Sequence, residues 1–172
     1  MSTPGISFIE VSQDGSLVTI GFSESINLIG TDTSVVSVLS DGQQNNITGV
    51  NVVGTSITLN LSNTILSGQS VNLNYIGSTT YIADNDGDQV AQVSNQQVTN
   101  NSNIIGFVDG NPYVGDFHIM PESGMKMTGA THGAGTDQII YSTAAASNTG
   151  SITTSSGSAA SSASSSSYSG SA

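Results

Sequence analysis

Apolar and polar side chains alternate through the first hundred residues, most clearly in the stretch Gly54–Gly77. Successive side chains of a β-strand point to opposite faces, so this alternation predicts two strands that are each apolar on one side. Gly and Ser at Ser67-Gly68 separate the two runs and favour a chain reversal, which predicts a hairpin. The alternating apolar residues are Ile57, Leu59, Leu61, Val71, Leu73 and Tyr75. A hairpin with one apolar face needs a second sheet over it, which we expect the rest of residues 1–100 to supply.

Further short runs rich in β-branched and aromatic residues surround this stretch. They lie at residues 6–12, 17–23, 34–39, 47–53 and 96–100. Asp14-Gly15 between the first two predicts another hairpin, whereas residues 23–34 and 79–97 are expected to be loops. About seven strands without a helical pattern predict an all-β, Ig-like β-sandwich over residues 1–101. Another all-β sandwich or a small barrel is the alternative.

The chain changes in composition after this predicted sandwich. Residues 102–115 are a polar stretch that we expect to be a linker. Residues 116–141 hold three of the four methionines, the single lysine and both histidines. Short β-rich runs at 117–120 and 125–128 flank the predicted turn Pro121–Gly124, and 138–141 resembles another short strand.

The segment 116–141 is too small to bury a core of its own. We therefore expect a small β-hairpin module that docks on the sandwich, on copies of itself or on a larger partner. Residues 142–172 form a low-complexity Ser/Ala/Gly tail with almost no large apolar groups. Such a tail should be extended and disordered in isolation, and ordered only by neighbouring subunits.

The charge balance excludes several partners. The chain has 12 carboxylates, one basic side chain and a net charge of −11, so it cannot neutralise nucleic-acid phosphates or adhere to an anionic membrane. It has no cysteine, which excludes disulfides and thiolate metal sites. The N-terminus lacks the basic start and apolar core of a secretory signal, and no apolar run approaches the ~20 residues that span a bilayer. We expect assembly in a host cytoplasm.

Asp84, Asp86 and Asp88 place three carboxylates in five residues, beside the amide of Asn85. Calcium prefers several oxygen ligands at about 2.3–2.6 Å, which such a loop can supply, so these three aspartates are the candidate calcium ligands. The spacing does not match an EF-hand, because Gly87 comes one position early. A solvated Asn/Asp/Gly turn is the plainer interpretation.

His118 and His132 could form a two-histidine, one-carboxylate metal site with Glu122 or Asp116. The alternative is that these histidines bond the backbone or line an interface, and a three-fold axis would make a ring of histidines conceivable. Met120, Met125 and Met127 either pack under the small module or form a docking surface. The expected interface residues are Phe117, His118, Met120, Met125, Met127, His132, Ile140 and Tyr141.

No pattern of catalytic residues stands out. The serines do not form a Gly-x-Ser-x-Gly elbow, no cysteine is available, and Lys126 alone could stabilise an oxyanion. Nothing pairs the scattered acids Glu10, Glu24 and Asp32 for glycosidase chemistry. We expect a protein that is not an enzyme and that needs no cofactor other than possible calcium.

Two resemblances follow from particular motifs. The order VVSVLSDG, GTSITLNLSNTILSGQSVNLNYIG, DNDGDQVAQV and QQVTNN makes residues 8–101 resemble the SwmB-type repeat domain of large cyanobacterial surface proteins. That resemblance implies a structural or adhesive Ig-like module, although the family carries tandem copies and this chain carries one. Residues 115–141 are similar to a short module in virion structural proteins of cyanobacterial phages. The matching residues are Gly115, Phe117, His118, Met127, Thr128, Gly129, Ala130, His132, Ile140 and Tyr141.

These features predict a phage virion structural protein, most simply a capsid decoration or cement protein. Its C-terminal region would dock on capsid or other virion proteins or on sibling copies in a homo-oligomer, and the Ig-like domain would lie on the virion surface. A host-recognition module of a tail fibre that binds surface glycan is one alternative, with Tyr75, Tyr81 and Tyr113 as stacking candidates. A fragment of a cell-surface adhesin is another.

Overall fold

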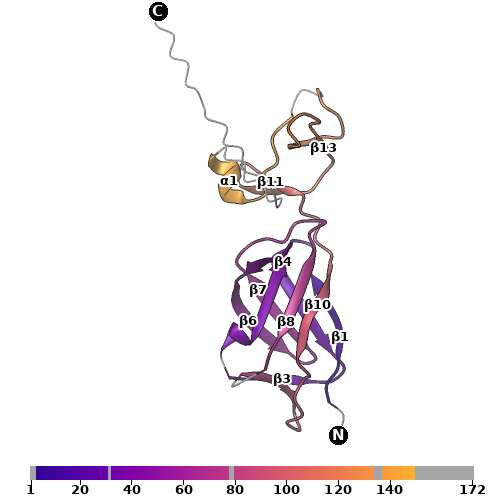
Figure 1. Ribbon diagram of the computed structural model, residues 1–172, viewed down its shortest axis with the longest axis vertical. Coiled ribbons are helices and arrows are strands. Elements are labelled where there is room, and N and C mark those ends of the chain that lie inside the picture. Colours follow the sequence, from indigo (N-terminus) through magenta and orange to yellow (C-terminus); the bar gives the residue numbers. More distant parts are fainter. Residues whose placement is uncertain (1–2, 31, 78–79, 134–136, 150–172) are drawn as a thin grey trace, which may run out of the picture.

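The structure is a computed structural model, and it describes residues 3–30, 32–77, 80–133 and 137–149. Eight strands build the N-terminal body, hydrogen-bonded in the order β5-β4-β8-β10-β1-β2-β7-β6 (Figure 1). They are β1 (Ile6–Val11), β2 (Leu17–Phe22), β4 (Val36–Ser40), β5 (Gln43–Asn45), β6 (Ile47–Val53), β7 (Ser56–Leu61), β8 (Val71–Tyr75) and β10 (Val93–Asn100).

The strand order is that of an immunoglobulin sandwich, so the predicted fold class is confirmed. Strands β1, β2, β7 and β6 occupy the A, B, E and D positions of one layer, and β5, β4, β8 and β10 occupy C′, C, F and G of the other. A short parallel pairing of β1 with β10, at Glu10–Thr99 and Val11–Asn100, joins the layers along one side. The remaining pairs are antiparallel, including the predicted β1–β2 hairpin.

The hairpin predicted within residues 54–77 is wrong. Strand β7 pairs with β2 and β6, whereas β8 pairs with β4 and β10 in the opposite layer. Residues 62–70 therefore cross from one layer to the other. Two runs with the same alternation look alike in sequence whether they pair side by side or bury their apolar faces against each other.

Two predicted loops contain strands. Strand β3 (Ile26–Ile29) lies in the segment 23–34, and β9 (Tyr81–Asp84) lies in 79–97. They pair antiparallel in a separate two-stranded sheet at one end of the sandwich (Figure 1). Both are only four residues long, too short to show a clear alternation.

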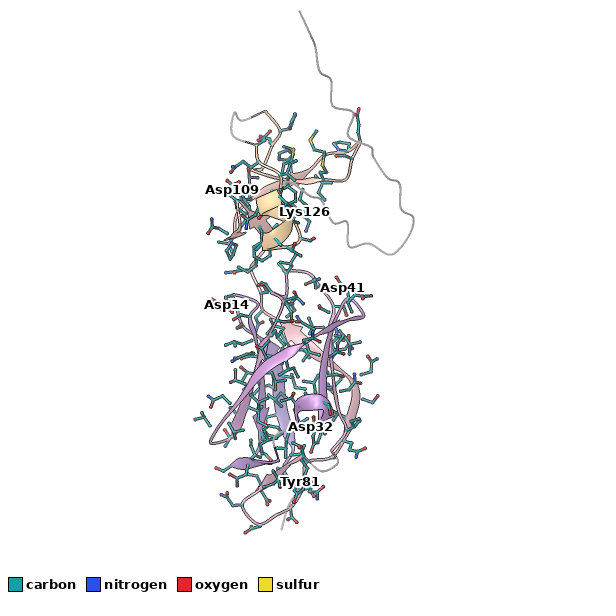
Figure 2. All side chains as sticks on the ribbon, turned by 90° about the vertical axis from the view of Figure 1, so that its left-hand side faces the viewer. Asp14, Asp32, Asp41, Tyr81, Asp109 and Lys126 are labelled. Carbon is teal, nitrogen blue, oxygen red and sulfur yellow. The ribbon has the colours of Figure 1, made fainter. Side chains whose placement is uncertain are left out.

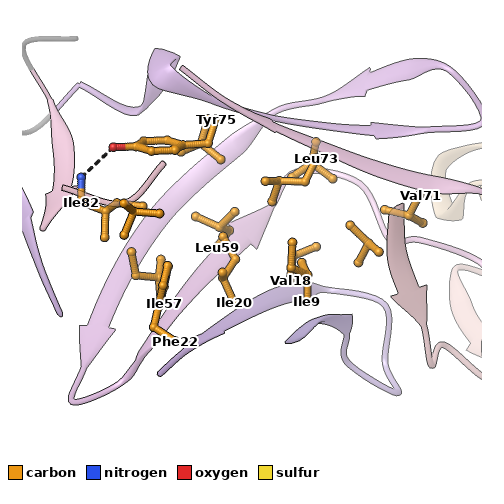
Figure 3. Close-up of a cluster of buried hydrophobic side chains, with 14 of the residues drawn as sticks. Ile9, Val18, Ile20, Phe22, Ile57, Leu59, Val71, Leu73, Tyr75 and Ile82 are labelled. Atoms are coloured by element: carbon orange, nitrogen blue, oxygen red, sulfur yellow. Dashed lines mark hydrogen bonds between the residues drawn. The ribbon is translucent and has the colours of Figure 1, made fainter. Parts of the chain in front are cut away.

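The core lies between the two layers, and Figure 3 shows part of it. Val18, Ile20 and Phe22, which share one face of β2, are all buried, as are the alternating residues of β7 and β8 apart from the half-buried Leu61. The most deeply buried side chains include Val18, Val38, Leu59, Ile65 and Leu73, each 0% exposed. Tyr75 is buried with them, and its hydroxyl accepts a 2.8 Å hydrogen bond from the N–H of Ile82 on β9.

Residues 100–104 leave the sandwich along its surface and are fixed to it. The N–H of Asn103 donates to the carbonyl of Gln13 at 3.0 Å, and the carbonyl of Ile104 accepts from Ser67 at 2.7 Å. Ser102 and Ile104 are buried. Gly15, at φ +69°, lies so close to the carbonyl of Ile65 and the hydroxyl of Ser102 that a Cβ atom would clash there. The beginning of the predicted linker is therefore part of the packed end of the sandwich.

The rest of the predicted linker is a hairpin, β11 (Gly106–Val108) with β12 (Asn111–Tyr113). Its loop is Asp109-Gly110, with φ +48° and +78°, and Asp41-Gly42 joins β4 to β5 in the same way with +49° and +78°. Positive φ at both loop positions is the type I′ geometry that favours Asp-Gly. The Asp-Gly pair at 109–110 is the hairpin signal that our linker interpretation overlooked.

A second hairpin follows, β13 (Phe117–Ile119) with β14 (Lys126–Thr128), and its turn lies where it was predicted. Residues 138–141 connect the two hairpins. Gln138 and Ile140 bond to Thr128 and Lys126 of β14, and Tyr141 exchanges two backbone hydrogen bonds with Phe107 of β11. We call residues 105–133 and 137–149, which lie beyond one end of the sandwich, the C-terminal module (Figure 1).

The tail prediction is wrong for its first residues. Helix α1 (Ala144–Thr149) packs on β11, and Ala146 and Ser147 are buried. Alanine has the highest helix propensity, the hydroxyl of Thr143 accepts from the N–H of Ala146 at 3.1 Å, and Ser147 accepts from Gly110 at 2.7 Å. Residues 150–172, the rest of the predicted tail, lie outside the described residues. No helix in the described ranges is long and apolar enough to cross a bilayer.

Replacing Tyr75 by Phe tests the link between β8 and β9. The change leaves the buried N–H of Ile82 without its partner, which should lower the free energy of unfolding by about 1–3 kcal/mol at neutral pH. Urea unfolding followed by far-UV circular dichroism measures this. An unchanged stability would contradict the role of the bond.

The same pair of proteins should differ in alkali. Burial raises the pKa of Tyr75 above its ordinary value of 10.0, although the N–H of Ile82 opposes the shift. The folded state thus favours the neutral phenol, so this contribution to stability is complete below about pH 10 and is lost as the pH rises further. The wild type should lose stability more steeply above about pH 10 than Tyr75→Phe, which retains the other four tyrosines.

Candidate functional site

The outer face of the β13–β14 hairpin is apolar and open to solvent. Phe117 and Ile119 share one face of β13 and are 36% and 56% exposed. The ammonium group of Lys126, on the paired strand β14, lies 5.2 Å from the centre of the Phe117 ring. This cation–π contact holds the single basic side chain of the chain beside the apolar face.

The other predicted interface residues differ in burial. Met120, Met125 and Met127 are half-buried, as is Tyr141. Ile140 is buried, and its side chain lies directly against Gly106, where a Cβ atom would clash with it. Ile140 thus packs inside the module of a single chain, whereas Phe117 and Ile119 face outward. Ile119 was not among the predicted interface residues, although its position two residues from Phe117 on a strand signals the same face.

The two histidines lie together under this hairpin. His118 is on β13 between Phe117 and Ile119 and therefore points to the opposite face. Its ring lies edge-on to that of His132, with 5.6 Å between the ring centres. The Nδ1 atom of His132 lies 3.0 Å from a carboxylate oxygen of Asp137, and the same oxygen accepts a 2.8 Å hydrogen bond from the N–H of Gly133.

One ligand atom from each of His118, His132 and Asp137 lies within 4.8 Å of the other two. The structure brings the two histidines together, and the carboxylate that lies beside them is Asp137, whereas Glu122 and Asp116 lie elsewhere. Glu122 belongs to the turn at the far end of the hairpin, and Asp116 is exposed, with its backbone carbonyl bonded to Gly129. The sequence signal that could have indicated Asp137 is a carboxylate five residues after His132, in a stretch that contains Gly133 and Gly135.

The aspartates of the candidate calcium loop do not converge in the same way. Asp84 is buried, and its Oδ1 atom accepts hydrogen bonds from the N–H groups of Asp86 and Asp88, both at 2.9 Å. The side chain of Asp86 is exposed. In the described ranges, His118, His132 and Asp137 form the group of three potential ligands, and the three loop aspartates form none. Their geometry is that of a turn closed by Asp84.

The charge of the sandwich has one sign. Residues 1–101 carry Glu10, Asp14, Glu24, Asp32, Asp41, Asp84, Asp86 and Asp88 and neither lysine nor arginine. Figure 2 shows Asp14 and Asp41 at the end nearest the C-terminal module, with Asp32 farther away. The hydroxyl of Ser12, helped by Ser16, lowers the pKa of Asp14, and the N–H of Ser34 lowers that of Asp32. Both carboxylates close local turns, which is a structural role.

A flagellar-system-associated repeat family, the SWM repeat, matches residues 2–80, which is just under half of the chain. The N-terminal part therefore resembles a repeat domain, as the motifs predicted. This match does not reach residues 115–141, so their similarity to virion proteins stays a prediction. A comparison with curated proteins gives no significant match.

Solved structures similar to this chain come from the bacterial S-layer protein SbsC. The crystal structure of its N-terminal part is 12% identical with a TM-score of 0.47, and the match covers 80% of this chain and 32% of that one. The crystal structure of rSbsC(31-844) is 14% identical with a TM-score of 0.46, covering 83% and 19%. This chain thus spans about a third or less of those structures, and we draw no functional conclusion from likenesses so distant.

Replacing Asp84 by Ala separates a structural turn from a calcium site. Loss of the buried carboxylate leaves the N–H groups of Asp86 and Asp88 without their acceptor, which should lower the free energy of unfolding by about 1–3 kcal/mol. Asp86→Ala is the matched control and should change it by less than about 0.5 kcal/mol, because its side chain is exposed. Equal effects, or a calcium-dependent rise in melting temperature lost in both variants, would instead favour calcium.

Proposed function

We propose that the protein is a non-enzymatic structural module of a surface assembly. The Ig-like sandwich is the displayed body, and the C-terminal module attaches it to a larger partner. The observation that carries this proposal is the exposed pair Phe117 and Ile119 on the outer strand of a small hairpin, fixed at one end of the sandwich. Large exposed apolar groups that are neighbours on one strand favour a contact surface.

The hairpin also offers a backbone edge. Strand β13 pairs with β14, and the described residues add no strand on its other side. A short edge strand with exposed apolar side chains can take up a strand from a partner, in which case the backbone supplies hydrogen bonds and the side chains fill pockets. Burial of the two side chains stabilises such a contact by a few kcal/mol at most, at roughly 25 cal/mol per Å².

The charges define the partner further. A chain with a net charge of −11 repels other copies of itself and other acidic surfaces over short distances. We therefore infer a protein subunit whose contact surface is apolar at its centre and basic at its rim. Many identical subunits of this kind, arranged in a lattice, would space the acidic sandwiches apart on the outside.

The finer form of the proposal is a virion structural protein, such as a capsid decoration protein assembled in the host cytoplasm. The similarity of residues 115–141 to virion modules supports it, and the apolar face lies within that stretch. The repeat similarity of residues 2–80 fits a displayed module equally well on a particle or on a cell envelope. Glycan recognition by the sandwich has less support, because Tyr75 is buried in the core and cannot stack on a sugar.

Fractionation of the source culture tests the location. Particles, cell envelope and free protein are separated by density-gradient sedimentation, and the chain is quantified in each fraction by mass spectrometry. Enrichment in particles at a fixed ratio to the major shell protein is the result expected for a virion protein. Enrichment in the envelope would overturn the virion form alone, and a free protein throughout would overturn the structural module itself.

The double variant Phe117→Ser/Ile119→Ser tests the docking surface. Both side chains are exposed, so the module should stay folded while binding to the isolated assembly weakens at least tenfold, about 1.4 kcal/mol. Val53→Ser/Ile76→Ser is the matched control, since those residues are 67% and 58% exposed on the sandwich. Co-sedimentation at a series of concentrations measures the affinity, and equal binding by both double variants would contradict the assignment.

A further inference from the structure

His118 carries an unusual ring nitrogen. Its Nδ1 atom lies 2.9 Å from the carbonyl oxygen of Gly129. A carbonyl only accepts hydrogen bonds, so Nδ1 must carry the proton and donate it. The other nitrogen, Nε2, then has a free lone pair in the neutral ring.

That Nε2 atom is buried and has no hydrogen-bond partner among the described residues. A buried polar atom without a partner loses its hydration and gains nothing in return, so it calls for an explanation. The Nδ1 edge of the His118 ring faces the carbonyl of Gly129, so the Nε2 edge points away from that carbonyl. The imidazole of His132 and the carboxylate of Asp137 lie close to this ring.

We propose that His118, His132 and Asp137 bind one divalent transition-metal ion of the zinc class. Two imidazole nitrogens and a carboxylate oxygen form a donor set that suits zinc, whereas calcium prefers oxygen ligands alone. The lone pair of His118 Nε2 would be the first ligand. The inference does not depend on the proposed attachment function.

The backbone groups that form hydrogen bonds with the ligand side chains support this assignment. Histidines that bind a metal through one nitrogen usually donate from the other to a carbonyl or carboxylate, as His118 does to Gly129. The carboxylate of Asp137 is likewise held by the N–H of Gly133. Two of the three ligands are therefore oriented by backbone groups of residues 129–133.

The third ligand is the adjustable one. Zinc bonds of about 2.0–2.2 Å place neighbouring tetrahedral ligands roughly 3.3–3.6 Å apart, so ligand atoms that now lie up to 4.8 Å apart must approach each other by up to about 1.5 Å. The side chain of His132 is 63% exposed and can turn inward, whereas that of Asp137 is only 12% exposed. A fourth position remains for water or a ligand from a partner.

A bound ion would tie β13 to His132 and Asp137. The module is small and the chain has no cysteine, so a metal is one of the few cross-links available to it. Without a metal, the 3.0 Å contact of His132 with Asp137 is a single surface contact, because His132 is 63% exposed, and such contacts contribute little to stability. A metal site requires His118 Nε2 as a ligand, whereas a metal-free contact between His132 and Asp137 does not involve that atom.

The experiment is a zinc titration of the full chain by calorimetry, after removal of any affinity tag and treatment with a chelator. The chain has two histidines and no cysteine, so every nitrogen ligand from a side-chain ring is one of these two. We expect one ion per chain, with visible absorption typical of a four-coordinate site when cobalt replaces zinc. The melting temperature of the C-terminal module should rise with zinc and fall back with chelator.

The variants isolate each ligand. His118→Asn keeps a donor for the carbonyl of Gly129 and removes Nε2, Asp137→Asn keeps an acceptor for Gly133, and His132→Ala alters an exposed side chain. Each should weaken zinc binding at least tenfold while circular dichroism stays unchanged. Glu122→Gln, an exposed carboxylate of the same module, is the control and should bind as the wild type does. Absence of saturable binding, or binding that survives His118→Asn, would overturn the proposal.

Discussion

The burial of two aliphatic strand faces against each other is the interaction on which this structure depends. The chain has no cysteine and one basic side chain, so neither disulfides nor a network of ion pairs can hold the layers together. The core is instead a continuous set of Val, Ile and Leu side chains between β2 and β7 on one side and β4 and β8 on the other. Only every second residue of a strand points into this core. The residues that point outward can therefore be small, polar or acidic.

The end of the sandwich from which the chain leaves toward the C-terminal module is also closely packed. Ile65, Ser102 and Ile104 are buried there, and Gly15 allows the crossing segment to approach the first hairpin loop. Backbone hydrogen bonds from Asn103 and Ser67 then fix the exit of the chain. The sandwich and the C-terminal module are thus joined by a short packed segment and not by a free linker. The packing of this segment on the sandwich sets the direction in which the module projects.

The sequence carried the fold class because strand alternation and Asp-Gly turns are local signals. They located the β1–β2 hairpin, the buried faces and the β13–β14 hairpin. The pairing of the strands was harder to predict from the sequence. The alternation in β7 and β8 indicates that each is buried on one side, but it does not indicate which strand lies beside which. The proposed metal site could be predicted only in part: the residue types of His118 and His132 pointed to it, whereas the closeness of Asp137 and the distance of Glu122 follow from the tertiary fold. Helix α1 was not predicted, because a segment of alanine and serine without large apolar groups resembles a disordered one and becomes ordered only when it packs on a surface such as β11.

Residues 138–141 have a consequence for the order in which the protein is made. They supply the backbone partners of both β11 and β14, yet they are the last β segment of the module to be synthesised. The sandwich is complete at Ile104 and can close while the following residues are still emerging. The two small hairpins, by contrast, gain their shared backbone partners only once residues 138–141 have been synthesised. The proposed docking surface on β13 therefore lies in a part of the protein that is completed after the sandwich.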